Sequence, residues 1–121
     1  MAIKEDIDDM NSMIMAGKAM DAFEKYYDES VVMQENENPP IYGKEVNRKR
    51  ETEFFDSLAI FHGAQIKAVA IGDGVSMVEC VFDVTPKGMS RIKMNQVAVQ
   101  RWNRGRIISE KFYHDSVSPK N

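Results

Sequence analysis

Apolar residues recur with helical spacing at the beginning of the chain. Ile3, Ile7, Met10 and Ile14 stand three or four positions apart, and Gly17 follows them. This period places the four side chains on one face of an amphipathic helix, and glycine is common just beyond a helix end. The pattern therefore predicts a first helix of about four turns.

Two more helices are expected before the middle of the chain. Ala19, Phe23 and either Tyr26 or Tyr27 form the apolar side of the second helix, which gives way to a short β-rich run at 31–33. Two prolines at 39 and 40 then interrupt regular structure because they remove backbone donors. Residues 44–58 have the pattern of a third helix. Its inward contacts, together with the residues just beyond it, are expected to be Val46, Phe54, Leu58 and Phe61.

From residue 64 onward the period of the pattern changes from helical to two. Residues 65–71, 75–85, 91–102 and 107–113 are predicted strands, and glycine-containing turns at 72–74, 86–88 and 103–105 separate them. Three helices followed by hairpin-linked strands indicate an α+β fold with an antiparallel sheet. We expect a single domain over residues 1–121.

Composition narrows the possible partners. The chain has 16 Lys and Arg against 19 Asp and Glu, a formal net charge of −3, so it lacks the basic excess on which nucleic-acid binding depends. The acidic N-terminus does not resemble a secretory signal, and no long uncharged apolar stretch is present. One cysteine and two histidines exclude an internal disulfide and a zinc cage of usual spacing. We expect a cytoplasmic protein with no nucleic-acid or membrane partner, no metal and no cofactor.

Three segments carry a resemblance to a known family. They are Tyr26-Tyr27-Asp28-Glu29-Ser30-Val31-Val32, Pro39-Pro40-Ile41-Tyr42-Gly43-Lys44-Glu45, and Trp102 with Gly105-Arg106-Ile107 and Phe112-Tyr113-His114-Asp115. In order and spacing they resemble the nuclear transport factor 2-like superfamily, in its SnoaL-like and ketosteroid isomerase-like branch. The resemblance implies a curved antiparallel β-sheet wrapped around the N-terminal helices, a cone-shaped barrel of the cystatin-like (NTF2-like) type with a pocket at its open end.

The resemblance also places the catalytic positions of the family on residues that cannot perform its chemistry. An ungapped alignment puts the general base of the isomerases on Gln34, the oxyanion tyrosine on Met10 and the protonated oxyanion acid on Val97. An amide does not shuttle protons, and neither Met nor Val donates a hydrogen bond to an enolate. The acid/base aspartate of the SnoaL-like cyclases falls on Phe112. Steroid isomerase and polyketide cyclase activities are therefore not expected.

The same alignment indicates which side chains line the cone. Inward-facing strand residues are expected to be Val78, Cys80, Phe82, Val84, Asn95, Val97, Val99, Glu110, Phe112 and His114. Ligand contacts are expected from Met10, Gln34, Phe54, Cys80, Phe82, Asn95, Val97, Glu110, Phe112 and His114. A mostly apolar lining with a few polar groups suits a small-molecule pocket, and it also describes an ordinary core.

His114 is the candidate catalytic base because it alone among the inward groups titrates near neutral pH in its ordinary state. That role needs a carboxylate partner, and Glu110, four positions away on one strand, lies about 13 Å off. The alternative is a histidine at the rim or in the core. Gln34 and Asn95 suit recognition of a carbonyl or hydroxyl group, or plain core hydrogen bonding. Cys80 is expected to be an inert core residue.

Three hypotheses about function follow. The first is a cofactor-free protein that binds a small apolar or carbonyl-containing molecule. The second is an isomerase, cyclase, dehydratase or hydrolase that acts on a small carbonyl compound with His114 as base. The third is a protein-interaction module with a collapsed cone. We also expect a homodimer through an exposed sheet face that includes Gln96, Ala98, Gln100 and Trp102.

Overall fold

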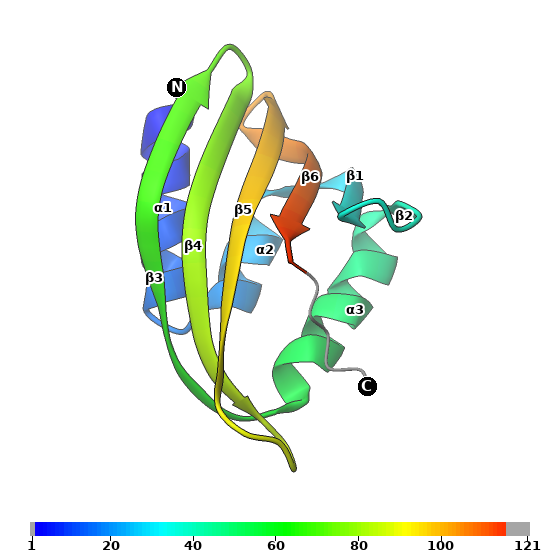
Figure 1. The fold of residues 1–121 in the computed structure, drawn as a ribbon. Helices are drawn as coiled ribbons and strands as arrows, with labels where there is room; N and C mark the ends of the chain where they lie inside the picture. The colour runs from blue at the N-terminus through cyan, green and yellow to red at the C-terminus, as the bar shows by residue number, and fades with distance from the viewer. Residues whose placement is uncertain (1, 116–121) are drawn as a thin grey trace.

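The structure, a computed structural model, describes residues 2–115 and combines three helices with one six-stranded sheet (Figure 1). The elements in chain order are α1 (Ile3–Met15), α2 (Ala19–Tyr26), β1 (Tyr27–Glu35), β2 (Ile41–Tyr42), α3 (Lys44–Asp56), β3 (Leu58–Gly72), β4 (Val75–Pro86), β5 (Ile92–Asn103) and β6 (Arg106–His114). The helices lie on the same side of the curved sheet. None of the helices within residues 2–115 is long and apolar enough to cross a membrane. The α+β prediction is confirmed.

Two strands begin earlier than the sequence pattern indicates. Strand β1 starts at Tyr27, directly after α2, rather than at 31. Strand β3 starts at Leu58 rather than near 64, because its first residues pair with the end of β4, beginning with Leu58 opposite Pro86. Local period alone does not reveal such pairing, since the partner strand lies elsewhere in the chain.

The sheet order is β2-β1-β6-β5-β4-β3, and the sheet remains open, with β2 and β3 at its edges. All pairs are antiparallel except β1 with β6, which run parallel, so the expectation of a purely antiparallel sheet is corrected at this pair. A long connection separates these two strands and allows the parallel arrangement. Three register irregularities lie in the pairing of β3 with β4, and Gly63 at one of them has a φ of 153°. Bulges of this kind bend a strand and explain the curvature.

The inward contacts of α3 differ from the prediction. Val46 is 53% exposed, and the buried residues of the helix are Lys44 and Asn47. The Asn47 Nδ2 atom donates to the carbonyl oxygens of Ile41 at 3.0 Å and Gly43 at 2.8 Å, which ties the start of the helix to β2. The apolar contacts of α3 are therefore confined to its C-terminal end, where Phe54 and the neighbouring Phe55 face the sheet side of the helix.

The core lies between α1, α2 and the concave face of the sheet. Its buried members from the helices and β1 include Ile7, Met10, Phe23, Val31 and Met33. The sheet contributes Val78, Cys80, Trp102 and Ile107. The predicted apolar faces of the first two helices are thus the faces that pack against the sheet.

Strand β5 presents the opposite face from the one predicted. Gln96, Ala98 and Gln100 pair directly with Cys80, Val78 and Ser76 of β4. Residues directly opposite in an antiparallel pair point to the same side, so these β5 residues face inward with their β4 partners.

The predicted inward residues of β5 therefore lie outside, Asn95 and Val97 being exposed and Val99 half-buried. For the same reason the residues expected on the dimer face lie inside: Ala98, Gln100 and Trp102 are buried and Gln96 is half-buried.

Candidate functional site

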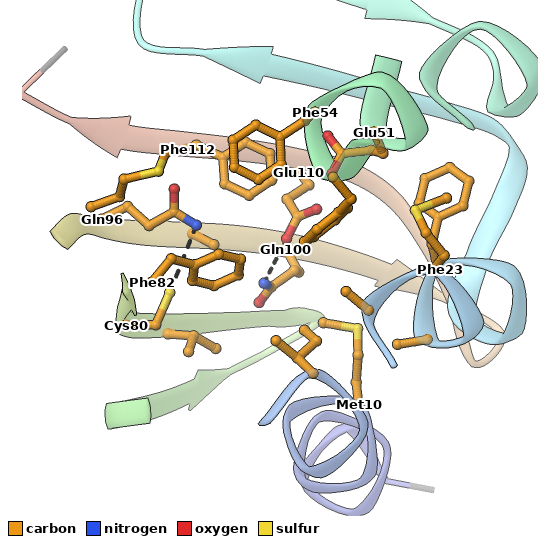
Figure 2. Close-up of a pocket in the computed structure, with 18 of the residues that line it drawn as sticks. Met10, Phe23, Glu51, Phe54, Cys80, Phe82, Gln96, Gln100, Glu110 and Phe112 are labelled. Atoms are coloured by element: carbon orange, nitrogen blue, oxygen red, sulfur yellow. Dashed lines mark hydrogen bonds between the residues drawn. The ribbon is translucent and has the colours of Figure 1, made fainter. Parts of the chain in front are cut away.

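The concave side of the sheet and the three helices enclose a hollow of about 500 Å³ (Figure 2). Most of its wall is apolar. Side chains of Met10, Ile14, Met20, Phe23, Phe54, Ile66, Val78, Phe82, Met94 and Phe112 contribute to it. The helices supply one half of this wall and strands β3 to β6 the other, so the hollow exists only because the sheet bends.

The polar floor of the hollow is built around Glu110 of β6, whose residue exposure is 3%. The Tyr27 hydroxyl donates a hydrogen bond to its Oε1 atom, and Gln100 Nε2 donates to its Oε2 atom at 2.8 Å. Tyr27 is itself held by stacking on Phe23, with ring centroids 4.6 Å apart. Each carboxyl oxygen thus receives one donor from a neighbouring buried side chain.

The amide of Gln100 is oriented by two further buried residues. Trp102 Nε1 donates to Ser76 Oγ at 2.9 Å, and Ser76 Oγ donates to Gln100 Oε1 at 2.6 Å. An indole N–H can only donate, so the serine hydroxyl accepts from it and directs its own proton to Gln100. The oxygen of the Gln100 amide must therefore face Ser76, and its nitrogen faces Glu110. In this series of three hydrogen bonds, each donor lies on the side away from Glu110, and the last bond ends on the Glu110 carboxyl group.

Burial dominates the electrostatics of this floor. Loss of water raises the pKa of Glu110 to about 7, although the hydrogen bonds from Tyr27 and Gln100 lower it. The pKa of Tyr27 lies well above its ordinary value because the phenol is buried and faces the Glu110 carboxylate. A carboxyl with a pKa near 7 exchanges its proton readily at neutral pH, which is the condition for general acid or base chemistry.

A second carboxyl, that of Glu51, faces the hollow from α3 (Figure 2). Burial raises its pKa to about 7, and the negative charges of Glu110 and Glu35 raise it too, whereas Arg50 lowers it. Two acidic groups on facing elements therefore share the hollow and repel each other when both are ionised.

His114 lies in the lining and has a carboxylate partner. Its Nε2 atom is 3.2 Å from Glu35 Oε1, and Glu35 also lines the hollow. The separation expected between His114 and Glu110 along one strand prevents that pair, and Glu35 of the adjacent β1 takes the place of Glu110. The backbone nitrogen of His114 is anchored by Asn36 Oδ1 at 3.1 Å.

Most of the predicted ligand contacts come together in the hollow, and three do not. The lining contains Met10, Phe54, Cys80, Phe82, Glu110, Phe112 and His114. Gln34 donates to the Asn38 carbonyl oxygen at 2.9 Å, and Asn95 and Val97 lie on the outer face of β5, so these three predictions are wrong in placement. Burial raises the pKa of the Cys80 thiol, so Cys80 remains suited to packing rather than to nucleophilic chemistry.

The sequence pattern does not single out Tyr27, Glu51 or Gln100 as site residues. Glu51 stands three positions before Phe54 and so shares its helix face, which is the only local signal available in a charged stretch. The ungapped alignment places Gln100 on the outer face because its register of β5 is shifted by one residue. Tyr27 continues the helical pattern of the preceding residues, so the pattern alone places it at the end of a helix and not at the start of a strand.

Comparisons with known proteins agree with this geometry. A structure of a candidate SnoaL-like polyketide cyclase from Mesorhizobium loti superposes with a TM-score of 0.84 at 27% identity, over 94% of this chain and all of that one. An NTF2-like protein of unknown function from Burkholderia xenovorans gives a TM-score of 0.74 at 15% identity, over 98% of this chain and 87% of that one.

A third neighbour comes from Catenulispora acidiphila and is described as a hypothetical protein with a ketosteroid isomerase-like fold in complex with trimethylamine. It gives a TM-score of 0.74 at 13% identity, over 89% of this chain and 84% of that one. No protein of curated function matches the chain. The model of the SnoaL-like domain matches residues 1–114, and the chain therefore belongs to the SnoaL-like domain family.

Proposed function

We propose that this protein binds a small, largely apolar organic molecule in the hollow and holds the polar group of that molecule against Glu110. The observation that carries the proposal is the contrast between the apolar wall and the buried polar floor around Glu110. Apolar surface provides affinity, and a few placed polar groups fix the orientation of a ligand. The hollow of about 500 Å³ falls within the range that accepts drug-sized molecules.

Two of the structural neighbours support a small organic molecule as the class of ligand. The Mesorhizobium loti protein is named as a candidate polyketide cyclase, and the Catenulispora acidiphila protein is described with trimethylamine. We retain the cytoplasm as the proposed location.

Binding can be tested with 2-naphthol, a neutral ring compound, followed by NMR of the methionine methyl groups. We expect shift changes at Met10 and Met20, which line the hollow. Ala98→Phe should abolish them, because Ala98 lines the hollow and the added ring would occupy it. The control is Val99→Phe, one residue along on the outer face of the same strand. Unchanged binding in the Ala98 variant would contradict the proposed site.

A second candidate function is proton transfer on a small carbonyl compound, and the two raised carboxyl pKa values favour it. In this reading Glu110 and Glu51 replace the catalytic positions that are lost at Gln34, Met10 and Val97. His114, paired with Glu35, is the alternative base. For any carbonyl compound that the protein converts, Glu110→Gln should abolish turnover if the carboxyl acts, whereas His114→Gln should abolish it if the imidazole acts.

We propose that the homodimer forms through the outer face of the sheet. Val97 and Tyr113, which are directly paired and 37% and 45% exposed, provide apolar area there. A pure interaction module with a collapsed cone has less support, since Phe54, Phe82 and Phe112 line the hollow and do not fill it.

A further inference from the structure

Two acidic groups of the hollow, Glu51 and Glu110, form no ion pair with a basic side chain within residues 2–115. Glu51 faces the hollow, and within residues 2–115 no hydrogen bond or ion pair joins its carboxyl to another side chain. Among the described side chains, Glu110 receives hydrogen bonds only from the neutral groups of Tyr27 and Gln100. A carboxylate placed away from water without a compensating charge is costly, and the cost falls if a ligand brings that charge.

Three basic side chains, two in the lining and one on the same helix as Glu51, do not neutralise the charge of these carboxylates. Arg50 is exposed on α3, and it lowers the pKa of Glu51 by less than burial raises it. His114 is engaged with Glu35. The buried Lys44 donates to the Glu24 carbonyl oxygen at 3.0 Å and does not line the hollow.

The hydrogen-bond chain that ends at Glu110 favours the same kind of ligand. Its donors run from Trp102 through Ser76 and Gln100, and a second donor comes from Tyr27. The remaining lone pairs of the ionised carboxyl are acceptors, so the floor is complementary to a group that donates. A ligand carbonyl would meet acceptors here unless Glu110 first took up a proton.

The walls suit an organic cation better than a metal ion. No three His, Cys, Asp or Glu side chains in the described part of the chain converge closely enough to hold a metal. The lining does contain several aromatic rings, those of Phe23, Tyr27, Phe54, Phe82 and Phe112. Aromatic faces attract ammonium groups and at the same time accept apolar substituents.

From these observations we propose that the ligand of the hollow is a small protonated amine with apolar substituents, whose positive charge lies between the carboxylates of Glu51 and Glu110. This inference rests on the proposed binding function and names its ligand class. The charge of the ligand replaces the protons that otherwise neutralise the two carboxyl groups.

The test uses three probes of matched shape: benzylamine as the cation, benzyl alcohol as the neutral compound and benzoate as the anion. Calorimetry at pH 7.5 should give benzylamine an affinity about tenfold or more above that of benzyl alcohol, a difference of about 1.4 kcal/mol. Benzoate should bind weakest. Glu51→Gln should reduce the preference for benzylamine to about threefold or less, without a comparable change for benzyl alcohol. The control Glu45→Gln removes an equal charge from an exposed site on the same helix.

Proton release provides an independent readout. Binding of benzylamine at pH 7 should release protons to the buffer and should tighten between pH 6 and 8, because the carboxyl groups must ionise. Other titratable or charged groups face this pair from the surrounding elements: Tyr27 and Glu35 on β1, Arg50 and Glu53 on α3, Cys80 on β4 and His114 on β6. Loss of the proton release in both Glu51→Gln and Glu110→Gln would assign it to the carboxyl pair.

The outcomes separate the two proposals. Equal affinities for benzylamine and benzyl alcohol, both abolished by Ala98→Phe, would overturn the cationic ligand and leave the binding function intact. Failure of all three probes to bind at millimolar concentration, with 2-naphthol also inactive, would overturn both. Preference for benzylamine that persists in Glu51→Gln and Glu110→Gln would also refute the assignment of the charge to this pair.

Discussion

The amide nitrogen of Gln100 donates a hydrogen bond to Oε2 of Glu110 at 2.8 Å. The amide cannot turn over to direct its oxygen at Glu110. Ser76 holds the Gln100 oxygen, and the indole of Trp102 in turn prevents the serine hydroxyl from reversing its direction. Ser76 and Trp102, which do not contact Glu110 directly, therefore determine that Gln100 offers Glu110 a donor and not an acceptor. Buried networks of this kind are costly to leave half-satisfied.

Ser76→Ala should destabilise the protein because it leaves the Trp102 N–H and the Gln100 oxygen without partners. We expect a loss of about 2–5 kcal/mol in the free energy of unfolding, measured by urea denaturation. Ser12→Ala, on an exposed position of α1, is the matched control and should change stability by less than about 0.5 kcal/mol. Equal effects in the two variants would show that the network does not contribute to stability.

Stability should fall as the pH rises from about 5 to 8. The pKa of Glu110 is raised to about 7 in the folded protein from an ordinary value of 4.5. Folding therefore favours the protonated carboxyl, and its contribution is complete below pH 4.5 and lost as the pH passes 7. For Glu110 alone, the expected loss in the free energy of unfolding is on the order of 3 kcal/mol.

Urea denaturation of the wild type and of Glu110→Gln across this pH range measures the effect. The variant should show a flatter profile, because its neutral amide does not titrate. The carboxylates of Asp9, Glu24 and Asp83 are held by basic partners that lower their pKa values, so they titrate below the range of the experiment. An unfolding free energy of the wild type that increases toward pH 8 would contradict the burial of Glu110.

Two adjacent isoleucines on β6 offer a test of the packing. Ile107 is fully buried, whereas Ile108 is 38% exposed. Ile107→Ala should cost about 2–5 kcal/mol of unfolding free energy through lost burial and the cavity that remains. Ile108→Ala should cost less than about 1 kcal/mol. Thermal or urea unfolding that gives equal losses would argue against the assignment of strand faces.

The proposed dimer predicts a light-scattering mass of two chains at micromolar concentration. Val97→Glu should reduce the mass to that of one chain, since it places a charge in the centre of the outer apolar area. Val46→Glu, at an exposed position of α3, should leave the mass unchanged. A mass of one chain for the wild type would reject the dimer.

Periodicity in the sequence correctly predicted the helices and most of the hairpins because amphipathic helices and half-buried strands need regular spacing of apolar residues. The inward faces of β4 and β6, including Val78, Cys80 and Phe112, were implied by the family resemblance together with the alternation of side chains along a strand. The Asn103 to Arg106 turn was also evident, and Arg104 and Gly105 both have positive φ, as a tight two-residue hairpin requires.

The face of β5 was decided only by tertiary pairing. The side-chain period of a strand is two, so an error of one residue in an ungapped alignment exchanges the inside for the outside. Pairing of Gln96 with Cys80 fixes the register and moves Gln100 to the floor of the hollow and Val97 to the surface. No residue of β5 by itself carries this information.

The sequence by itself determined the three helices, the hairpin-linked strands of the second half and the family to which the chain belongs, because local periodicity and short motifs are properties of contiguous residues. It did not indicate β2 or the early starts of β1 and β3. Only the tertiary structure decided that Glu51 and Glu110 share one hollow, since α3 and β6 are far apart in the chain. The raised pKa values of both carboxyl groups have the same main origin, burial, and the charges of Glu110 and Glu35 raise the pKa of Glu51 further. Both effects arise only when distant elements pack together.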